Sequence, residues 1–244
     1  MSLLPTDIWQ VIVGFCPIKL KFRKVCKQLR DLEYEILYMY FPNRHSITEF
    51  PTNLRVATLY PNRFTKDLQQ TGINFEYVIS LDCGINNCLE DKDLLLLPNL
   101  INLYCVCNKN FTNAGIIGLN NLISFECGCN TNFTDECLIN LPNLTSLDCY
   151  KNINLTENGV ASLKKLKILI CGNNTNFTDT LLIELPNLTK LDCGFNKKFT
   201  NQGLHNLPLL EKVISSENGH ITKDYVKRYF PLVKCEIFPE FKFI

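Results

Sequence analysis

Cysteine carries most of the reactive chemistry in this chain, which has 13 cysteines among 244 residues. In two places a single residue separates two cysteines, Cys105 from Cys107 and Cys127 from Cys129, and clustered thiols are ligands that zinc prefers. The pattern argues against a metal site, because Cys107 and Cys129 fall where the chain is expected to turn out of a strand. A disulfide would need an oxidising compartment, for which the sequence carries no address. We expect reduced cysteines, no metal and no cofactor.

Groups that perform catalysis are scarce in the sequence. The three histidines form no visible Cys-His or Ser-His constellation for nucleophilic catalysis, and no glycine-rich phosphate loop occurs. Four acidic residues recur at one position of a repeated unit, so they form a stripe and not a paired acid and base: Asp82, Glu126, Asp148 and Asp192. We therefore predict no catalytic residues and a chain that is not an enzyme.

Two residue types recur with a strict 22-residue period along most of the chain. The cysteines of this series are Cys83, Cys105, Cys127, Cys149, Cys171 and Cys193. The asparagines are Asn86, Asn108, Asn130, Asn152, Asn174, Asn196 and Asn218. A short period repeated this often predicts one small unit stacked on copies of itself, because a single unit cannot bury its apolar face alone.

Aligned copies read Leu-x-x-Leu-x-Cys-x-x-Asn-x-x-Phe-Thr-Asp-x-x-Leu-x-x-Leu-Pro-Asn, and this pattern is identified as a leucine-rich repeat. Its first half alternates apolar and polar residues, which predicts a short strand with the second leucine and the cysteine turned inward. The asparagine has no apolar reason to recur, so we expect its amide to satisfy backbone groups of the turns above and below. The fold class is therefore α/β, a leucine-rich-repeat solenoid with short parallel β-strands inside and short helices outside.

The second half of the unit carries helix signals. Thr134-Asp135 and Thr178-Asp179 are N-cap pairs, apolar residues follow at a spacing of three, and Pro142 and Pro186 stop the segment. We predict a helix of two turns in each copy. The repeat also generates Asn-x-Thr sequons, at Asn132 for example, which we interpret as by-products of the pattern and not as glycosylation sites.

The first 50 residues lack the period and indicate two amphipathic helices. A helix start at Leu4-Pro5-Thr6-Asp7 is followed by apolar residues at helical spacing, and a second helix is expected over about 20–40. The run from Leu4 to Ile12, followed by Arg23-Lys24-Val25-Cys26-Lys27-Gln28-Leu29-Arg30, resembles an F-box. The repeat is similar to the cysteine-containing leucine-rich repeats that many F-box proteins carry.

This resemblance implies an adaptor of a ubiquitin ligase. In that family the F-box docks on a Skp-type protein within a cullin ligase, and the repeats hold the protein that is ubiquitinated. The residues that match the docking positions are Leu4, Pro5, Ile8, Val11, Ile12, Phe15, Val25 and Cys26. The chain departs from the family in a shorter link between the two helices and in Leu29, where tryptophan is common. Two alternatives stay open: N-terminal helices that only cap the first repeat, and a binding scaffold or competitor that recruits no ligase.

The resemblance and the period together divide the chain into four parts. Residues 1–50 form the F-box-like helical module, and 51–75 form a connector with a degenerate capping repeat. Residues 76–231 are the leucine-rich repeats, and 232–244 are a truncated C-terminal repeat that closes the stack.

Strand residues between the inward ones face the concave side of such a solenoid, where we expect the target protein to bind. The candidate residues are Asp82, Tyr104, Glu126, Asp148, Tyr150, Asp192 and Phe195. Their acidic character predicts a basic target. The alternative is a face that is merely solvated, since exposed strand positions are usually polar.

Composition narrows the setting in which the chain works. A net charge of +1 disfavours a general nucleic-acid binder, and no apolar stretch has the length of a membrane span. Without a signal peptide, the chain is expected in the cytoplasm or nucleus. Alanine occurs only at Ala57, Ala114 and Ala161, a bias typical of AT-rich coding. Together with the F-box resemblance it indicates a protist, a virus or an intracellular bacterium, and in the last two cases the chain would work in a host cell.

Overall fold

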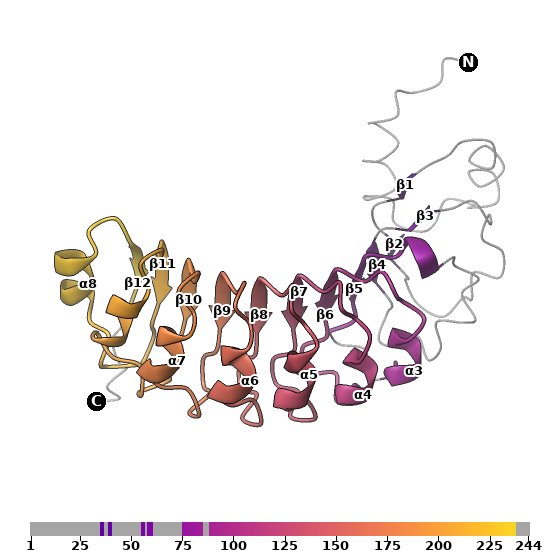
Figure 1. The fold of residues 1–244 in the computed structure, drawn as a ribbon, viewed down its shortest axis with the longest axis horizontal. Coiled ribbons are helices and arrows are strands. Elements are labelled where there is room, and N and C mark those ends of the chain that lie inside the picture. The colour runs from indigo at the N-terminus through magenta and orange to yellow at the C-terminus, as the bar shows by residue number, and fades with distance from the viewer. Residues whose placement is uncertain are drawn as a thin grey trace, which may run out of the picture.

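The computed structural model describes residues 75–84 and 88–237, together with four short strands before them, and shows a curved stack of repeated units (Figure 1). Strands line the concave side of the stack and short helices line the convex side. The strands are β1 (Glu35–Ile36), β2 (Met39–Tyr40), β3 (Arg55–Val56), β4 (Thr58–Tyr60), β5 (Ser80–Asp82), β6 (Asn102–Tyr104), β7 (Ser124–Glu126), β8 (Ser146–Asp148), β9 (Ile168–Ile170), β10 (Lys190–Asp192), β11 (Lys212–Ile214) and β12 (Lys234–Glu236). The helical segments are η2 (Phe75–Tyr77), α3 (Asp91–Leu94), α4 (Asn113–Ile116), α5 (Asp135–Ile139), α6 (Glu157–Ala161), α7 (Asp179–Ile183), η3 (Gly203–Asn206) and α8 (Lys223–Tyr229).

Ten of the described strands form one parallel sheet in the order β12-β11-β10-β9-β8-β7-β6-β5-β4-β2, and β1 pairs separately with β3. Neighbouring strands of the repeats pair without slippage, so that Leu81 faces Leu103 and Phe125 faces Leu147. These aligned residues are fully buried between the sheet and the helices. The predicted α/β leucine-rich-repeat solenoid is confirmed.

The cysteine ladder lies inside this core. All six cysteines of the 22-residue series are buried, and all are free thiols. The thiol of Cys83 donates to the carbonyl of Tyr104 at 3.6 Å, and that of Cys193 donates to Ile214 at 3.7 Å. Each is a weak contact with the next strand that a leucine side chain cannot make. Burial raises the pKa of Cys193 to about 12, so its thiol stays protonated at neutral pH.

The asparagine ladder binds the copies to one another, as the sequence predicted. The side-chain Nδ2 of Asn174 donates to the carbonyls of Asn152 at 2.7 Å and Leu155 at 3.2 Å. Its Oδ1 accepts from the backbone N–H of Asn176 at 2.9 Å. One detail is corrected: these hydrogen bonds join the amide of Asn174 to the preceding copy and to its own turn, so it fastens its copy in one direction only.

The helices are shorter than the predicted two turns. From α3 to α7 each has four or five residues, η3 is a 3-10 segment, and only α8, with seven residues, approaches two turns among the described helices. The chain must return from the convex to the concave side within a few residues, for example between Ile139 and Ser146, which leaves no room for a second turn. No helix in the described ranges has both the length and the apolar character that a bilayer crossing requires.

A second set of ties joins the helix starts of neighbouring copies, and the sequence did not predict it. Asp135, at the start of α5, accepts from the backbone N–H of Thr156 at 2.7 Å and from its hydroxyl at 2.5 Å. Glu157 receives the same two bonds from Thr178, at 2.6 and 2.7 Å. Asp135 and Glu157 thus each serve the next copy. Thr178 also caps its own helix by accepting from Thr180 N–H.

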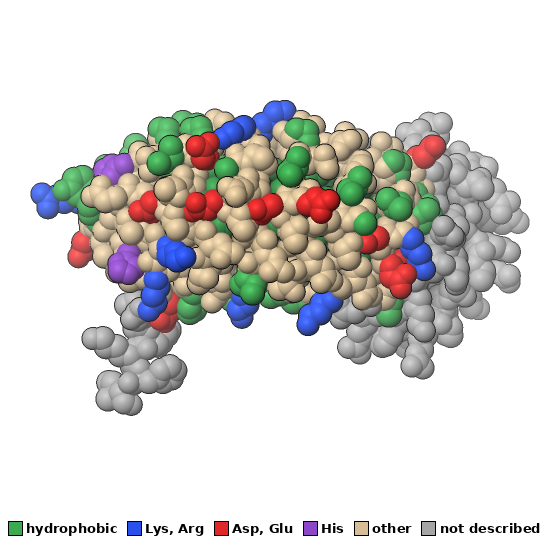
Figure 2. All heavy atoms as spheres, turned by 60° about the horizontal axis from the view of Figure 1, so that its bottom comes forward, with side chains coloured by type: hydrophobic (Ala, Val, Ile, Leu, Met, Phe, Trp, Pro, Cys, Tyr) green, Lys and Arg blue, Asp and Glu red, His purple; other side chains and the backbone are tan. Residues whose placement is uncertain are grey.

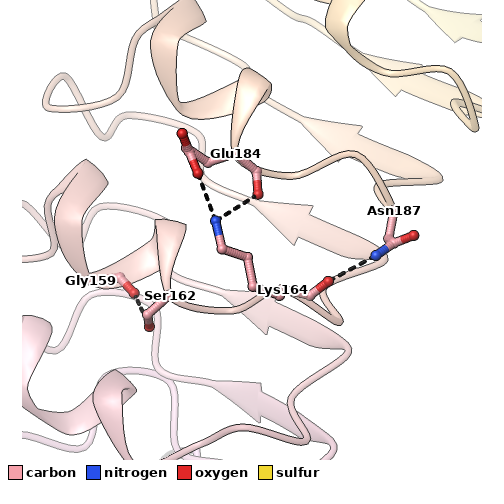
Figure 3. A network of polar contacts seen from close by, with 5 residues as sticks. All are labelled: Gly159, Ser162, Lys164, Glu184 and Asn187. Carbon is pink, nitrogen blue, oxygen red and sulfur yellow. Dashed lines mark hydrogen bonds and ion pairs between the residues drawn. The ribbon is translucent and has the colours of Figure 1, made fainter.

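The asparagine that follows the proline stop provides a third tie (Figure 3). Asn187 Nδ2 donates to the carbonyl of Lys164 at 2.8 Å, and the Lys164 ammonium pairs with Glu184 at 2.6 Å. Asn143 donates in the same way to the preceding copy, at 3.2 Å. Asn143 and Asn187 are sequon asparagines, and so is Asn132, which reaches the Lys109 carbonyl at 2.5 Å. These residues therefore have a structural reason to recur.

At the N-terminal end of the sheet, β4 and β2 continue the stack, with Leu59 opposite Leu81 and Met39 opposite Leu59. The helix predicted over about 20–40 is wrong at Glu35–Ile36 and Met39–Tyr40, which are strands, because pairing with an open sheet edge satisfies backbone groups that a helix end leaves free. The residues matched to the F-box, from Leu4 to Cys26, lie outside the described residues.

Candidate functional site

The concave face is built by the strand residues on either side of each aligned core residue, because side chains alternate along a strand. Asp82 lies opposite Tyr104, Tyr104 opposite Glu126, and Glu126 opposite Asp148, on four successive strands spaced about 4.8 Å apart. All four side chains are half-buried. The structure therefore brings these predicted residues together in one continuous row.

The other three candidates border this row. Asp192 on β10 is separated from Asp148 by Ile170 on β9. The hydroxyl of Tyr150 accepts from Asn173 Nδ2 at 3.0 Å, which fixes the ring over the next copy. The turn residue Phe195 has a left-handed backbone, with φ of 62°, and leaves 48% of its surface exposed.

The carboxylates of the row stand in an unfavourable electrostatic environment. Partial burial, followed by repulsion from Asp148 and Asp82, raises the pKa of Glu126, and Lys190 only partly offsets this. Burial also raises the pKa of Asp148, although the backbone N–H of Tyr150 donates to its Oδ1 at 2.9 Å and stabilises the charged form. The row therefore holds negative charge that its surroundings do not fully compensate.

A lysine row on the same face was missed by the sequence reasoning. The predicted residues follow each aligned leucine, whereas the residue before that leucine faces the same side of the sheet. At that position Lys190, Lys212 and Lys234 occupy β10, β11 and β12 in register. The Lys212 ammonium pairs with Glu236 at 2.6 Å. The candidate surface therefore has two signs of charge and is not uniformly acidic.

The two cysteines considered as metal ligands lie in the turns after β6 and β7, as predicted. Cys107 and Cys129 have left-handed backbones, with φ of 62° and 60°. Their backbone N–H groups donate to the next copy, to Gly128 at 2.9 Å and to Tyr150 at 2.7 Å. Within the described ranges, no three His, Cys, Asp or Glu side chains converge on a point where a metal ion would sit.

Exposure predicts which thiols react. In the native protein we expect iodoacetamide to alkylate the exposed Cys107 quickly, while the six buried ladder cysteines stay unmodified until denaturant is added. Burial excludes the reagent and raises the pKa of thiols such as Cys149, which removes the reactive thiolate. Mass spectrometry of proteolytic peptides gives the extent of labelling at each site. Native labelling of Cys127 as fast as that of Cys107 would contradict the buried ladder.

The convex face offers a weaker candidate. An exposed apolar residue lies at the end of α3, α4, α5 and α7, and each is more than half exposed: Leu95, Ile117, Ile139 and Ile183. Figure 2 turns the helix-bearing side forward and shows the hydrophobic side chains as separate groups among polar and charged ones. Separated groups of this kind are normal on a protein surface. The continuous strand face is therefore the stronger candidate surface.

Comparison with known proteins gives relatives of this chain in fold but not in sequence. No family model and no curated protein matches the sequence. Among solved structures the chain is similar to one from the yeast Rad7 and Elc1 complex, with a TM-score of 0.60 and 17% identity over 74% of this chain and 54% of that chain. It is similar to one from the Drosophila Toll and Spatzle complex, with a TM-score of 0.51 and 16% identity over 69% of this chain and 24% of that chain. Internalin C2 of Listeria monocytogenes gives a TM-score of 0.43 and 25% identity over 59% of this chain and 74% of that chain.

The chain thus spans about half the length of the yeast chain to which it is similar. At this identity the likeness concerns the fold alone. The parallel sheet, the buried asparagine ladder and the short convex helices define a leucine-rich-repeat solenoid, and the likeness to the yeast and Drosophila structures agrees with that class.

Proposed function

We propose that this chain is a protein-interaction adaptor that captures a target protein on its concave face and docks on a Skp-type protein of a cullin ubiquitin ligase through its N-terminal segment. The observation that carries the first half is the continuous concave sheet, which presents half-exposed charged and aromatic side chains in register across successive strands. Solenoids of this kind use such extended concave surfaces for binding. The chain acts by recruitment, and partner proteins perform the ubiquitin transfer.

Two observations support the docking half of the proposal. The sequence from Leu4 to Arg30 resembles an F-box. A chain of similar fold was solved in the complex of Rad7 with Elc1, so that fold occurs there in an assembly with another protein. In the present chain the docking residues would be the apolar ones matched to the motif, including Ile8, Val11 and Val25.

Co-purification with a eukaryotic Skp-type protein tests the docking half. We expect the full chain to retain the Skp-type protein. The Ile8→Asp variant should retain at least about tenfold less of it, because a buried charge disrupts an apolar interface. Ile139→Asp is the matched control, since Ile139 lies 67% exposed on the convex face and its change should leave recovery intact. Equal recovery with Ile8→Asp and Ile139→Asp would refute docking through this segment.

A scaffold that recruits no ligase is the second candidate, and the N-terminal strands favour it. Because β2 and β4 continue the repeat sheet in register, part of the N-terminal segment covers the end of the stack. If the whole segment is only a cap, Ile8→Asp will lower the melting temperature of the isolated chain, and no Skp-type protein will be recovered with either form.

A further inference from the structure

The two sides of the concave face differ in charge. The outward strand residues of β5 to β8 include three carboxylates and no lysine or arginine; they are Ser80, Asp82, Asn102, Tyr104, Ser124, Glu126, Ser146 and Asp148. Those of β10 to β12 include three lysines and two carboxylates; they are Lys190, Asp192, Lys212, Ile214, Lys234 and Glu236. Charge is therefore segregated along the stack.

An apolar strand separates these two regions. On β9 both outward residues are isoleucines, Ile168 and Ile170, and both are half-buried. They lie directly between Asp148 on β8 and the Lys190 strand, β10. Because the isoleucines contribute no charge, a bound segment meets an acidic region, an apolar divider and a lysine-bearing region in that order.

Internal pairing leaves the acidic region the less compensated of the two. Lys212 already has an ion pair with Glu236. Burial raises the pKa of Asp192, and both Lys190 and Lys212 act against this rise. In the acidic region, burial and then repulsion from Asp148 and Asp82 raise the pKa of Glu126, and Lys190 is the lysine that acts against this rise. A cationic partner group placed there would relieve this repulsion, which makes the acidic region the stronger attractor.

A partner that complements both regions carries both signs of charge. A nucleic acid or a polyphosphate has only negative charge and would be repelled by the acidic region. Asp148 and Lys212 lie three strands apart, which is about 14 Å at the usual strand spacing, or about four residues of an extended chain. Tyr150 and the exposed Phe195 add aromatic surface beside the two regions.

We propose that the concave face binds a protein segment in extended form whose basic residues lie over β5 to β8 and whose acidic residues lie over β10 to β12, with about four residues between the two groups. This inference rests on the proposed function, because it describes the target that the adaptor captures. It replaces a simply basic target with one of ordered, opposite charges.

Synthetic peptides of ten residues test the inference with the full chain. One has three lysines and three glutamates in separate blocks joined by a Gly-Ser spacer, a second has the blocks in reverse order, and a third alternates the same charges. We expect one of the two block peptides to bind at least about tenfold more tightly than the alternating peptide, measured by fluorescence anisotropy at low salt. Asp148→Lys and Lys212→Glu should each remove this advantage. Lys164→Glu on the convex face is the control and should leave it unchanged, because Lys164 pairs with Glu184 away from the strands.

The outcomes separate this inference from the broader function. Equal binding of block and alternating peptides, sensitive to Asp148→Lys, would overturn the ordered-charge inference and leave concave capture standing. Binding of all peptides that neither strand variant affects would overturn both the inference and the choice of this face. No binding of any peptide at millimolar concentration would also overturn the inference, while the Skp-type co-purification remains an independent test of the adaptor.

Discussion

Replacing Asn174 with alanine is expected to lower the free energy of unfolding by about 3 kcal/mol, because three hydrogen bonds of a fully buried side chain disappear at once. The carbonyl of Asn152 loses its buried donor. Urea unfolding followed by circular dichroism measures the loss.

Asn152 supplies a matched control at the same position of the preceding copy. Its Oδ1 accepts from Asn154 N–H at 3.1 Å, but its Nδ2 has no hydrogen-bond partner among the described residues. Asn152→Ala should therefore cost about 1 kcal/mol. Equal losses for Asn152→Ala and Asn174→Ala would show that the amide bonds to the preceding copy do not hold the stack together.

The fold was predictable because the same physical requirement recurs in every copy. A core position such as Leu103 or Cys105 is buried for the same reason as its equivalents 22 residues away. An apolar residue that occurs by chance in one copy is therefore easily told from a core position that recurs in all of them. Helix length was not predictable in this way. It depends on how quickly the chain must return to the sheet after a residue such as Ile139, and a periodic pattern contains no information on that path.

The candidate site was predicted in part. The row from Asp82 to Asp148 follows from strand alternation, which also applies to the residue before each aligned leucine. The sequence alone could therefore have placed Lys190 and Lys212 on the concave face. The ties between copies were harder to predict, since Asp135 looks like a first-turn acid of its own helix until the structure shows that Thr156 of the next copy donates to it.

A period of 44 residues is hidden within the period of 22. Glycine recurs every 44 residues, as Gly115, Gly159 and Gly203, and each faces the aspartate that begins the helix of the preceding copy. A Cβ atom added to Gly159 would lie 2.4 Å from Asp135 Oδ1 and 2.7 Å from Asp135 Cβ. In the next copy the pair is Glu157 with Leu181, where a longer acid accompanies a larger residue.

Gly159→Ala is therefore expected to cost about 2 kcal/mol of unfolding free energy, although alanine is the better helix former, because the added methyl group forces two copies apart. Gly84→Ala is the control, since the nearest atom to its added Cβ is the Val106 carbonyl oxygen at 3.6 Å and the change should cost far less.

Asp135→Glu should recover part of the loss in the Gly159→Ala background. The extra methylene lets the carboxylate reach Thr156 from a larger separation, as Glu157 reaches Thr178 at 2.6 Å in the next copy. We expect a coupling energy of about 1 kcal/mol from the double-mutant cycle, measured by urea unfolding of the four forms. Two results would contradict this coupling: strictly additive changes in unfolding free energy, or a loss for Gly159→Ala no greater than that for Gly84→Ala. Either would mean that Asp135 and Gly159 do not jointly set the spacing of the copies.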